Sequence, residues 1–157
     1  MKTAFALTFS LSLLGSVSQA GETTQNEHVR VEVSLSKPSA MPGDKLELAV
    51  RFKPADGIHI TSDPPLAIHV TPSNMVQLLG KWSQIVDSTT GYLATEEPVK
   101  QPMRISSTTT PGQHLLTATI TYYFCSDEAG WCRKFVETLQ LPLTVQASQT
   151  KPARKPK

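Results

Sequence analysis

Apolar and polar residues alternate along much of this chain, and the alternation has a period of two. It is clearest in four segments, which are residues 29–35, 46–52, 116–124 and 139–145. Successive side chains of a β-strand point to opposite faces of the sheet, so this pattern predicts half-buried strands. No helical period of useful length occurs after residue 20.

Shorter apolar segments lie between these four, and proline-rich turns separate them. The shorter strand candidates are residues 57–60, 66–70, 76–79 and 103–106. Seven or eight short strands within about 120 residues, divided by such turns, are typical of an antiparallel β-sandwich of the immunoglobulin-like type. A closed barrel is the alternative. The length favours a single all-β domain, which we place at residues 21–147.

The first twenty residues have the composition of a secretory signal peptide. Lys2 is their only charged residue, residues 4–17 are mostly apolar, and small residues precede a cleavage site after Ala20. A signal of this kind is removed on export. We therefore expect a periplasmic or secreted protein with no stable membrane insertion after cleavage.

The positive balance of the chain comes from its last residues. Four Lys and Arg lie in residues 151–157, which contain no large apolar side chain. Because such a segment cannot offset the entropy of ordering, we predict that residues 148–157 form a disordered, basic, Pro-rich tail. Residues 21–150 hold ten Lys and Arg against thirteen Asp and Glu. This composition argues against a nucleic-acid-binding protein.

Cys125 and Cys132 are the only cysteines, and six residues separate them. They lie between two predicted strands, so a hairpin would bring their Cα atoms within the roughly 4.4–6.8 Å that a disulfide needs. Export favours the oxidised pair. The chain-entropy estimate for closing so short a loop is about 2.5 kcal/mol, against nearly 5 kcal/mol for about a hundred residues. The bond is either a modest staple or a working redox couple.

The charges beside the two sulfurs differ. Arg133 and Lys134 follow Cys132, whereas two acids follow Cys125. Nearby cations favour the thiolate, which is the attacking form of cysteine. Cys132 is therefore the predicted nucleophile and Cys125 the predicted resolving thiol. The neighbouring Trp131 would either pack in the core or take part in shielding or docking.

The residues around the cysteines resemble a known family. They are the segments 119–125 (TITYYFC), 130–132 (GWC) and 139–143 (LQLPL), with a weaker likeness at 57–60 (GIHI). Together they look like the amino-terminal periplasmic domain of the thiol-disulfide interchange protein DsbD. The resemblance implies an immunoglobulin-like sandwich that passes electrons from a thioredoxin-like protein or a membrane electron conduit to oxidised envelope proteins. It also implies that the second cysteine, Cys132, forms the mixed disulfide with partners.

The chain departs from the family pattern in two places. Known members have five residues between the cysteines, where this chain has six. The acidic and aromatic cap loop of the family has its nearest counterpart in residues 87–92, where Tyr92 is the candidate for shielding. Phe124 is a second aromatic candidate for shielding or docking. A non-catalytic binding or accessory module with a structural hairpin disulfide is the alternative function.

Other chemistry finds little support in the sequence. His28, His59, His69 and His114 lack the spacing of a zinc site, and no blue-copper pattern follows either cysteine. We expect neither a metal nor a cofactor. There is no nucleophile elbow and no phosphate-binding glycine loop. His59 lies in the segment that resembles the family, but the sequence assigns it no step.

Overall fold

The structure is a computed structural model, and it describes residues 26–147. The signal peptide predicted at residues 1–20 and the tail predicted at residues 148–157 lie outside the described residues. Within residues 26–147 there is no helix, so none is present that could cross a membrane.

Nine strands make up this part of the chain. They are β1 (Val29–Leu35), β2 (Ser39–Ala40), β3 (Lys45–Pro54), β4 (Ile58–Ile60), β5 (Ala67–Thr71), β6 (Val76–Leu78), β7 (Val99–Ile105), β8 (Gly112–Ser126) and β9 (Trp131–Val145). One sheet has the order β1-β3-β7-β6. The other has the order β2-β9-β8-β4, and β5 pairs with β8 farther along that strand.

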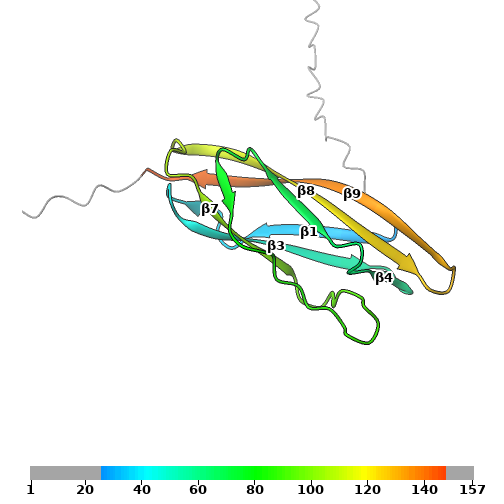
Figure 1. The fold of residues 1–157 in the computed structure, drawn as a ribbon. Helices are drawn as coiled ribbons and strands as arrows, with labels where there is room; N and C mark the ends of the chain where they lie inside the picture. The colour runs from blue at the N-terminus through cyan, green and yellow to red at the C-terminus, as the bar shows by residue number, and fades with distance from the viewer. Residues whose placement is uncertain (1–25, 148–157) are drawn as a thin grey trace, which may run out of the picture.

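The two sheets lie face to face as a single immunoglobulin-like β-sandwich, as predicted (Figure 1). The neighbouring strands are antiparallel except for β2, which pairs in parallel with the end of β9. Nine strands form where seven or eight were expected, because the two-residue β2 is too short to show alternation. The predicted strand at residues 103–106 is the end of the longer β7.

The core lies where β3 of one sheet faces β8 of the other. Leu48 and Val50 on β3 are fully buried, as are Ile120 and Tyr122 on β8. Phe52 meets Tyr122 edge to face, with 5.2 Å between the ring centroids. The apolar residues of the alternating pattern therefore lie on the inner faces of the two sheets, which is the arrangement that the period of two predicts.

The hairpin of β8 and β9 extends beyond the regular apolar alternation. β9 begins at Trp131, beside the strand start at Cys132 that a hairpin predicts, whereas the alternation is regular only from residue 139. The first half of β9 lacks this pattern because Arg133 and Glu137 occupy two of its inward positions. Figure 1 shows the two strands running side by side to one end of the molecule, where the short β4 also lies. That end holds both cysteines.

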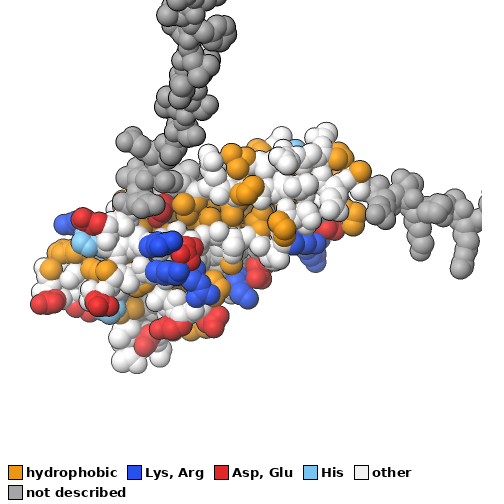
Figure 2. Space-filling view, turned by 180° about the vertical axis from the view of Figure 1, so that it is seen from behind, with side chains coloured by type: hydrophobic (Ala, Val, Ile, Leu, Met, Phe, Trp, Pro, Cys, Tyr) orange, Lys and Arg blue, Asp and Glu red, His pale blue; other side chains and the backbone are white. Residues whose placement is uncertain are grey.

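The surface mixes charges of both signs. Figure 2 shows Lys and Arg side chains lying among Asp and Glu on the face turned away from the view of Figure 1. Two of the basic residues on β1 and β3, Arg30 and Lys53, pair with Glu32 at 3.3 and 2.7 Å. Exposed pairs of this kind contribute little to stability.

Candidate redox site

Cys125 and Cys132 face each other across the β8–β9 hairpin and form a disulfide. Their Cα atoms are 4.1 Å apart. This short separation is typical of a non-hydrogen-bonded pair in an antiparallel ladder, where the backbone groups of both residues point away from each other. The prediction that the two cysteines meet at one end of a β-sandwich is confirmed.

A short loop closes the hairpin directly after the disulfide. The backbone N–H of Gly130 donates to the carbonyl of Ser126 at 2.9 Å, and the N–H of Ala129 donates to the Ser126 hydroxyl at 3.3 Å. Gly130 has a φ of +66°, a conformation that glycine adopts without steric cost. The loop therefore holds the two strand ends in register, and the sulfurs opposite each other, independently of the S–S bond.

The two cysteines differ sharply in exposure. Cys125 is 7% exposed, and Cys132 is an exposed residue on the adjacent strand. Their positions in the sheet explain this difference. Cys125 is on β8, which has neighbours on both sides at this point. Cys132 is on β9, which pairs only with β8 here among the described residues.

The other side of Cys125 is occupied by β4. His59 is the residue directly opposite Cys125 in that pairing. Residues that pair directly in an antiparallel ladder place their side chains on the same face of the sheet. The imidazole of His59 and the two sulfurs therefore share the outer face of the sheet, with Cys125 in the middle.

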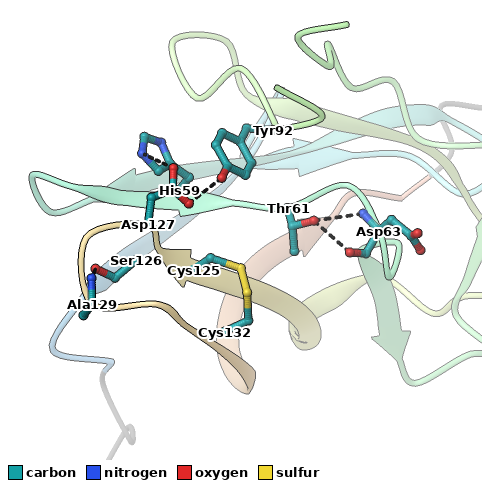
Figure 3. The surroundings of a disulfide bond; sticks show 9 residues. All are labelled: His59, Thr61, Asp63, Tyr92, Cys125, Ser126, Asp127, Ala129 and Cys132. Carbon is teal, nitrogen blue, oxygen red and sulfur yellow. Dashed lines mark hydrogen bonds and ion pairs between the residues drawn. A yellow bond between two sulfur atoms is a disulfide. The ribbon is translucent and has the colours of Figure 1, made fainter. Parts of the chain in front are cut away.

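Tyr92 covers the far side of His59. The two rings stack with 4.5 Å between their centroids and 4° between their planes. The Tyr92 hydroxyl donates to Oδ1 of Asp127 at 2.6 Å, and Nε2 of His59 lies 3.7 Å from the other carboxylate oxygen. Figure 3 shows Asp127 joining the two rings beside the disulfide. We call His59, Tyr92 and Asp127 the polar cluster.

The hydrogen bond to Asp127 has an electrostatic consequence. It raises the pKa of Tyr92 above the usual range of a phenol, because ionised tyrosine would repel the carboxylate and lose the bond. Tyr92 therefore stays a neutral donor at physiological pH. Asp127, which the sequence counted only as an acid near Cys125, is engaged by this donor.

The loop that carries Tyr92 is itself well ordered by hydrogen bonds. Asp87 Oδ1 accepts from the N–H groups of Thr89 at 2.7 Å and Thr90 at 3.3 Å, and these bonds lower the pKa of the Asp87 carboxyl. The N–H of Leu93 donates to Ile60 of β4 at 2.7 Å. The loop at residues 87–92, predicted as a counterpart of the family's cap, is thus tied to β4. Its aromatic residue rests on His59.

The remaining aromatic candidates lie on the inner side of the hairpin. Phe124 is 2% exposed and belongs to the core, so it offers no docking surface, contrary to that part of the expectation. Its side chain points inward because it alternates with Cys125. Trp131 is half-buried and meets the Phe124 ring edge to face at 5.7 Å. The Arg133 guanidinium lies 4.5 Å above the Trp131 ring, a cation–π contact.

This arrangement restricts the approach of a reacting thiolate. In thiol–disulfide exchange a thiolate attacks one sulfur along the axis of the bond that breaks. The S–S bond here joins β8 to β9 (Figure 3). Attack on Cys132 would come from the outer edge of β9, which is open within the described residues. Attack on Cys125 would come from the side of His59, which is occupied.

The sequence located the disulfide, and the family resemblance named Tyr92 beside it. The sequence assigned His59 no role, because only the pairing of β4 with β8 places His59 opposite Cys125. A signal was present in the alternation of Ile58 and Ile60, which makes His59 the outward residue of a strand. Among the described residues, no group of three His, Cys, Asp or Glu side chains could hold a metal ion.

Fold and site together define an immunoglobulin-like β-sandwich with a cross-strand disulfide at one end. No protein-family model and no curated protein matches the chain. Solved structures that resemble it include the amino-terminal domain of DsbD from Neisseria meningitidis in its reduced form. That domain shares 17% identity with a TM-score of 0.34, over 73% of this chain and 90% of its own.

Two further solved structures that resemble the chain are of proteins whose names differ from that of DsbD. The GAE domain of yeast GGA1 shares 20% identity with a TM-score of 0.44, over 75% of this chain and 95% of its own. The seventh ScaB type I cohesin from Pseudobacteroides cellulosolvens shares 14% identity with a TM-score of 0.44, over 81% of this chain and 97% of its own. Similarities at this level concern the fold alone.

Proposed function

We propose that this protein is a thiol–disulfide exchange module of the cell envelope. It passes electrons from a thioredoxin-like protein or a membrane electron conduit to oxidised envelope proteins through the Cys125–Cys132 couple. The observation that carries the proposal is the unequal exposure of the pair, with Cys125 at 7% and Cys132 exposed at an open strand edge. Reactive disulfides present one accessible sulfur to the partner.

The exchange proceeds in two balanced steps. A donor thiolate attacks Cys132, an S–S bond forms between donor and Cys132, and Cys125 leaves as a thiolate that takes up a proton. The second donor thiol, as a thiolate, then attacks the donor sulfur of this mixed disulfide and releases Cys132. The donor ends as a disulfide, and this protein ends as a dithiol. The same steps in reverse reduce the disulfide of an acceptor protein.

The limited structural need for the bond supports this function. β8 and β9 pair continuously from Ser126↔Trp131 to Gly112↔Val145, and a hydrogen-bonded loop closes the hairpin. The disulfide closes a sequence separation of only seven residues. A cross-link over so short a loop constrains the unfolded chain by about 2.5 kcal/mol, and its loss would leave the strands paired.

The location is part of the proposal. Disulfides persist in oxidising compartments outside the cytosol, and the composition of residues 1–20 favours export. We place the protein in the periplasm or outside the cell. Its thiol-reducing role there requires a supply of electrons from another protein.

The experiment that tests the function is a redox titration of the full chain together with a rate measurement. We expect a reduction potential above about −300 mV, since structural disulfides of secreted proteins usually lie below that value. Reduced thioredoxin should reduce the bond much faster than an equal concentration of glutathione does. A potential well below that limit, with no reduction by thioredoxin, would contradict the proposal.

One observation favours the alternative of a non-catalytic binding module. Ile85 is 58% exposed and Val86 is 37% exposed on the segment that precedes Tyr92. Exposed apolar residues on this segment would suit a partner that binds without chemistry. Changing both to Ser should abolish binding to that partner while leaving the reduction by thioredoxin intact, if the alternative is correct.

A further inference from the structure

The outer edge of β9 is an unpaired strand edge beside the accessible sulfur. Within residues 26–147, β9 has a second neighbour only at its far end, where β2 pairs with Thr144 and Val145. Pro142 has no N–H and ends the series of donors before that pairing. The open edge therefore extends over residues 132–140.

The direction of the backbone groups follows from three hydrogen bonds. The N–H of Thr144 donates to Pro38 at 3.0 Å, and that of Gln146 donates to Ala40 at 2.8 Å, both away from β8. On β8, the carbonyl of Tyr123 accepts from Thr61 at 3.0 Å, away from β9. The β8–β9 register is continuous, so every second residue of β9 follows Thr144.

Cys132, Lys134, Val136 and Thr138 therefore turn their N–H and C=O groups to the open edge, whereas Arg133 and Phe135 bond to β8. Exposed edges of this kind pair readily with another chain, and proteins usually cover or interrupt them. Here the apolar Val136 is 48% exposed, on the same face as Cys132. The edge is open and partly apolar next to the sulfur.

We infer that an extended segment of the redox partner pairs with this edge as an added strand and brings the partner's reactive cysteine to Cys132. The inference rests on the proposed function and names how the partner is recognised. An added strand lies about 4.8 Å from β9, which holds the partner's surface directly beside the accessible sulfur.

The orientation of the S–S bond supports the same direction of approach. In-line attack on Cys132 comes from the side opposite Cys125, which is the side of the open edge. One docking mode thus supplies both backbone hydrogen bonds and the geometry of attack. The occupant is an extended segment of a thiol-bearing protein, bound through its main chain, with Val136 contacting one of its side chains.

The first test uses hydrogen exchange in a trapped complex. The Cys125→Ser variant is joined through Cys132 to thioredoxin whose resolving cysteine is Ser. In the free variant, the amides of Lys134 and Val136 should exchange fast and those of Arg133 and Phe135 slowly. In the complex, Lys134 and Val136 should slow by at least about tenfold, as newly bonded amides do. Unchanged exchange at both would overturn the inference and leave the proposed function standing.

The second test removes one edge donor. Lys134→Pro deletes an N–H that faces the edge and no bond to β8. We expect reduction by thioredoxin to slow by at least about tenfold, while reduction by dithiothreitol stays within about twofold. Lys134→Ala, which keeps the N–H, is the matched control and should stay within about threefold of the wild type.

Equal slowing by Lys134→Ala would assign the effect to the side chain and overturn docking through the backbone. Wild-type rates with Lys134→Pro would do the same. If the Lys134→Pro variant does not fold, the hydrogen-exchange test decides the inference alone, because it does not use that variant. If thioredoxin fails to reduce the wild type while dithiothreitol succeeds, the proposed function falls, and the docking mode falls with it.

Discussion

The two flanks of the disulfide are built differently. On the β4 flank, His59 lies opposite Cys125, Tyr92 stacks on His59, and Asp127 holds both rings. On the β9 flank, Cys132 borders an edge that no described strand covers. A symmetrical bond is thus placed in an asymmetrical site. In the proposed function, the closed flank protects Cys125 as the resolving sulfur, and the open flank leaves Cys132 to a partner.

Under the proposed function, this contrast lets a rigid sandwich direct exchange chemistry without a catalytic base. The sheet order would then decide which sulfur is attacked, since attack along the S–S axis needs space beyond the sulfur. Charge adds to this effect. Lys134 follows Cys132 on the open side, whereas Asp127 is bound to Tyr92 on the closed side. Cations near a thiol favour the thiolate.

Removing the bond altogether should have the largest effect on stability and should leave both flanks in place. The double variant Cys125→Ser, Cys132→Ser should lose about 2.5 kcal/mol of unfolding free energy, measured by urea titration against the oxidised wild type. The strand pairing should persist in amide exchange. Collapse of the hairpin, or a loss near 5 kcal/mol, would show that the bond is a structural staple.

Opening the closed flank should reduce the difference in reactivity between the sulfurs of Cys125 and Cys132. His59→Ala removes the ring opposite Cys125 and the support of Tyr92. We expect the share of glutathione attached to Cys125, measured by mass spectrometry after brief exchange and alkylation, to rise severalfold. His59→Phe keeps a ring in that place and should retain the wild-type distribution. An unchanged share in the alanine variant would show that β4 does not protect Cys125.

The inner side of β9 offers a control that should leave the open flank unaffected. Glu137 is 4% exposed, and its Oε2 has no partner among the described residues. Burial raises the pKa of its carboxyl. The stabilising contribution of the Glu137 carboxyl is therefore fully present below pH about 4.3, the usual pKa of Glu. It is lost as the pH rises through the raised pKa of the folded protein.

Glu137→Gln removes this charge. At neutral pH the variant should be more stable than the wild type by about 1 kcal/mol, and the difference should shrink toward pH about 4. Urea titrations at both pH values measure it. Reduction by thioredoxin should not change. A less stable variant at neutral pH would show that the carboxylate has a favourable partner in the fold.

The smallest effect concerns the hydroxyl of Tyr92. Its pKa is raised by the bond to Asp127, so the folded protein keeps the phenol protonated at pH values where the unfolded chain ionises it. The stabilising contribution of the Tyr92 hydroxyl is present below pH about 10, the usual pKa of Tyr. It is lost as the pH rises from there through the raised pKa of the folded protein.

Tyr92→Phe should not show that alkaline loss. Melting temperatures recorded on either side of pH about 10 should converge for the two proteins as the pH rises. Because the phenylalanine ring keeps the stack on His59, exchange at Cys132 should keep its wild-type rate. A slower alkaline decline in the wild type than in the variant would contradict the assigned hydrogen bond.

The fold was predictable because its longest strands bury one face only. The alternating residues 29–35 and 46–52 form β1 and most of β3, and residues 116–124 form the middle of β8. Pro102, directly before the predicted strand at residues 103–106, lies inside β7 and does not end it. The first half of β9 lacks regular alternation because the inward positions between Trp131 and Leu139 include the charged Arg133 and Glu137.

The site was predictable only in part. The short spacing of Cys125 and Cys132 predicted their bond, since a hairpin is local in sequence. Their unequal exposure depends on strand order, and strand order joins segments distant in sequence. His59 and Tyr92 reach the disulfide through such pairings, at the bridges of β4 with β8 and of Thr61 with Tyr92. No local pattern contains that information.

Trapping a partner on single-cysteine variants tests the central claim most directly. Each variant is mixed with thioredoxin that lacks its resolving cysteine and carries thionitrobenzoate on the other, and release of thionitrobenzoate reports the mixed disulfide. Cys125→Ser, which keeps Cys132, should react rapidly and accumulate the complex, whereas Cys132→Ser should react far more slowly. Equal rates, or faster reaction through Cys125, would contradict the assignment of the open flank as the site of exchange.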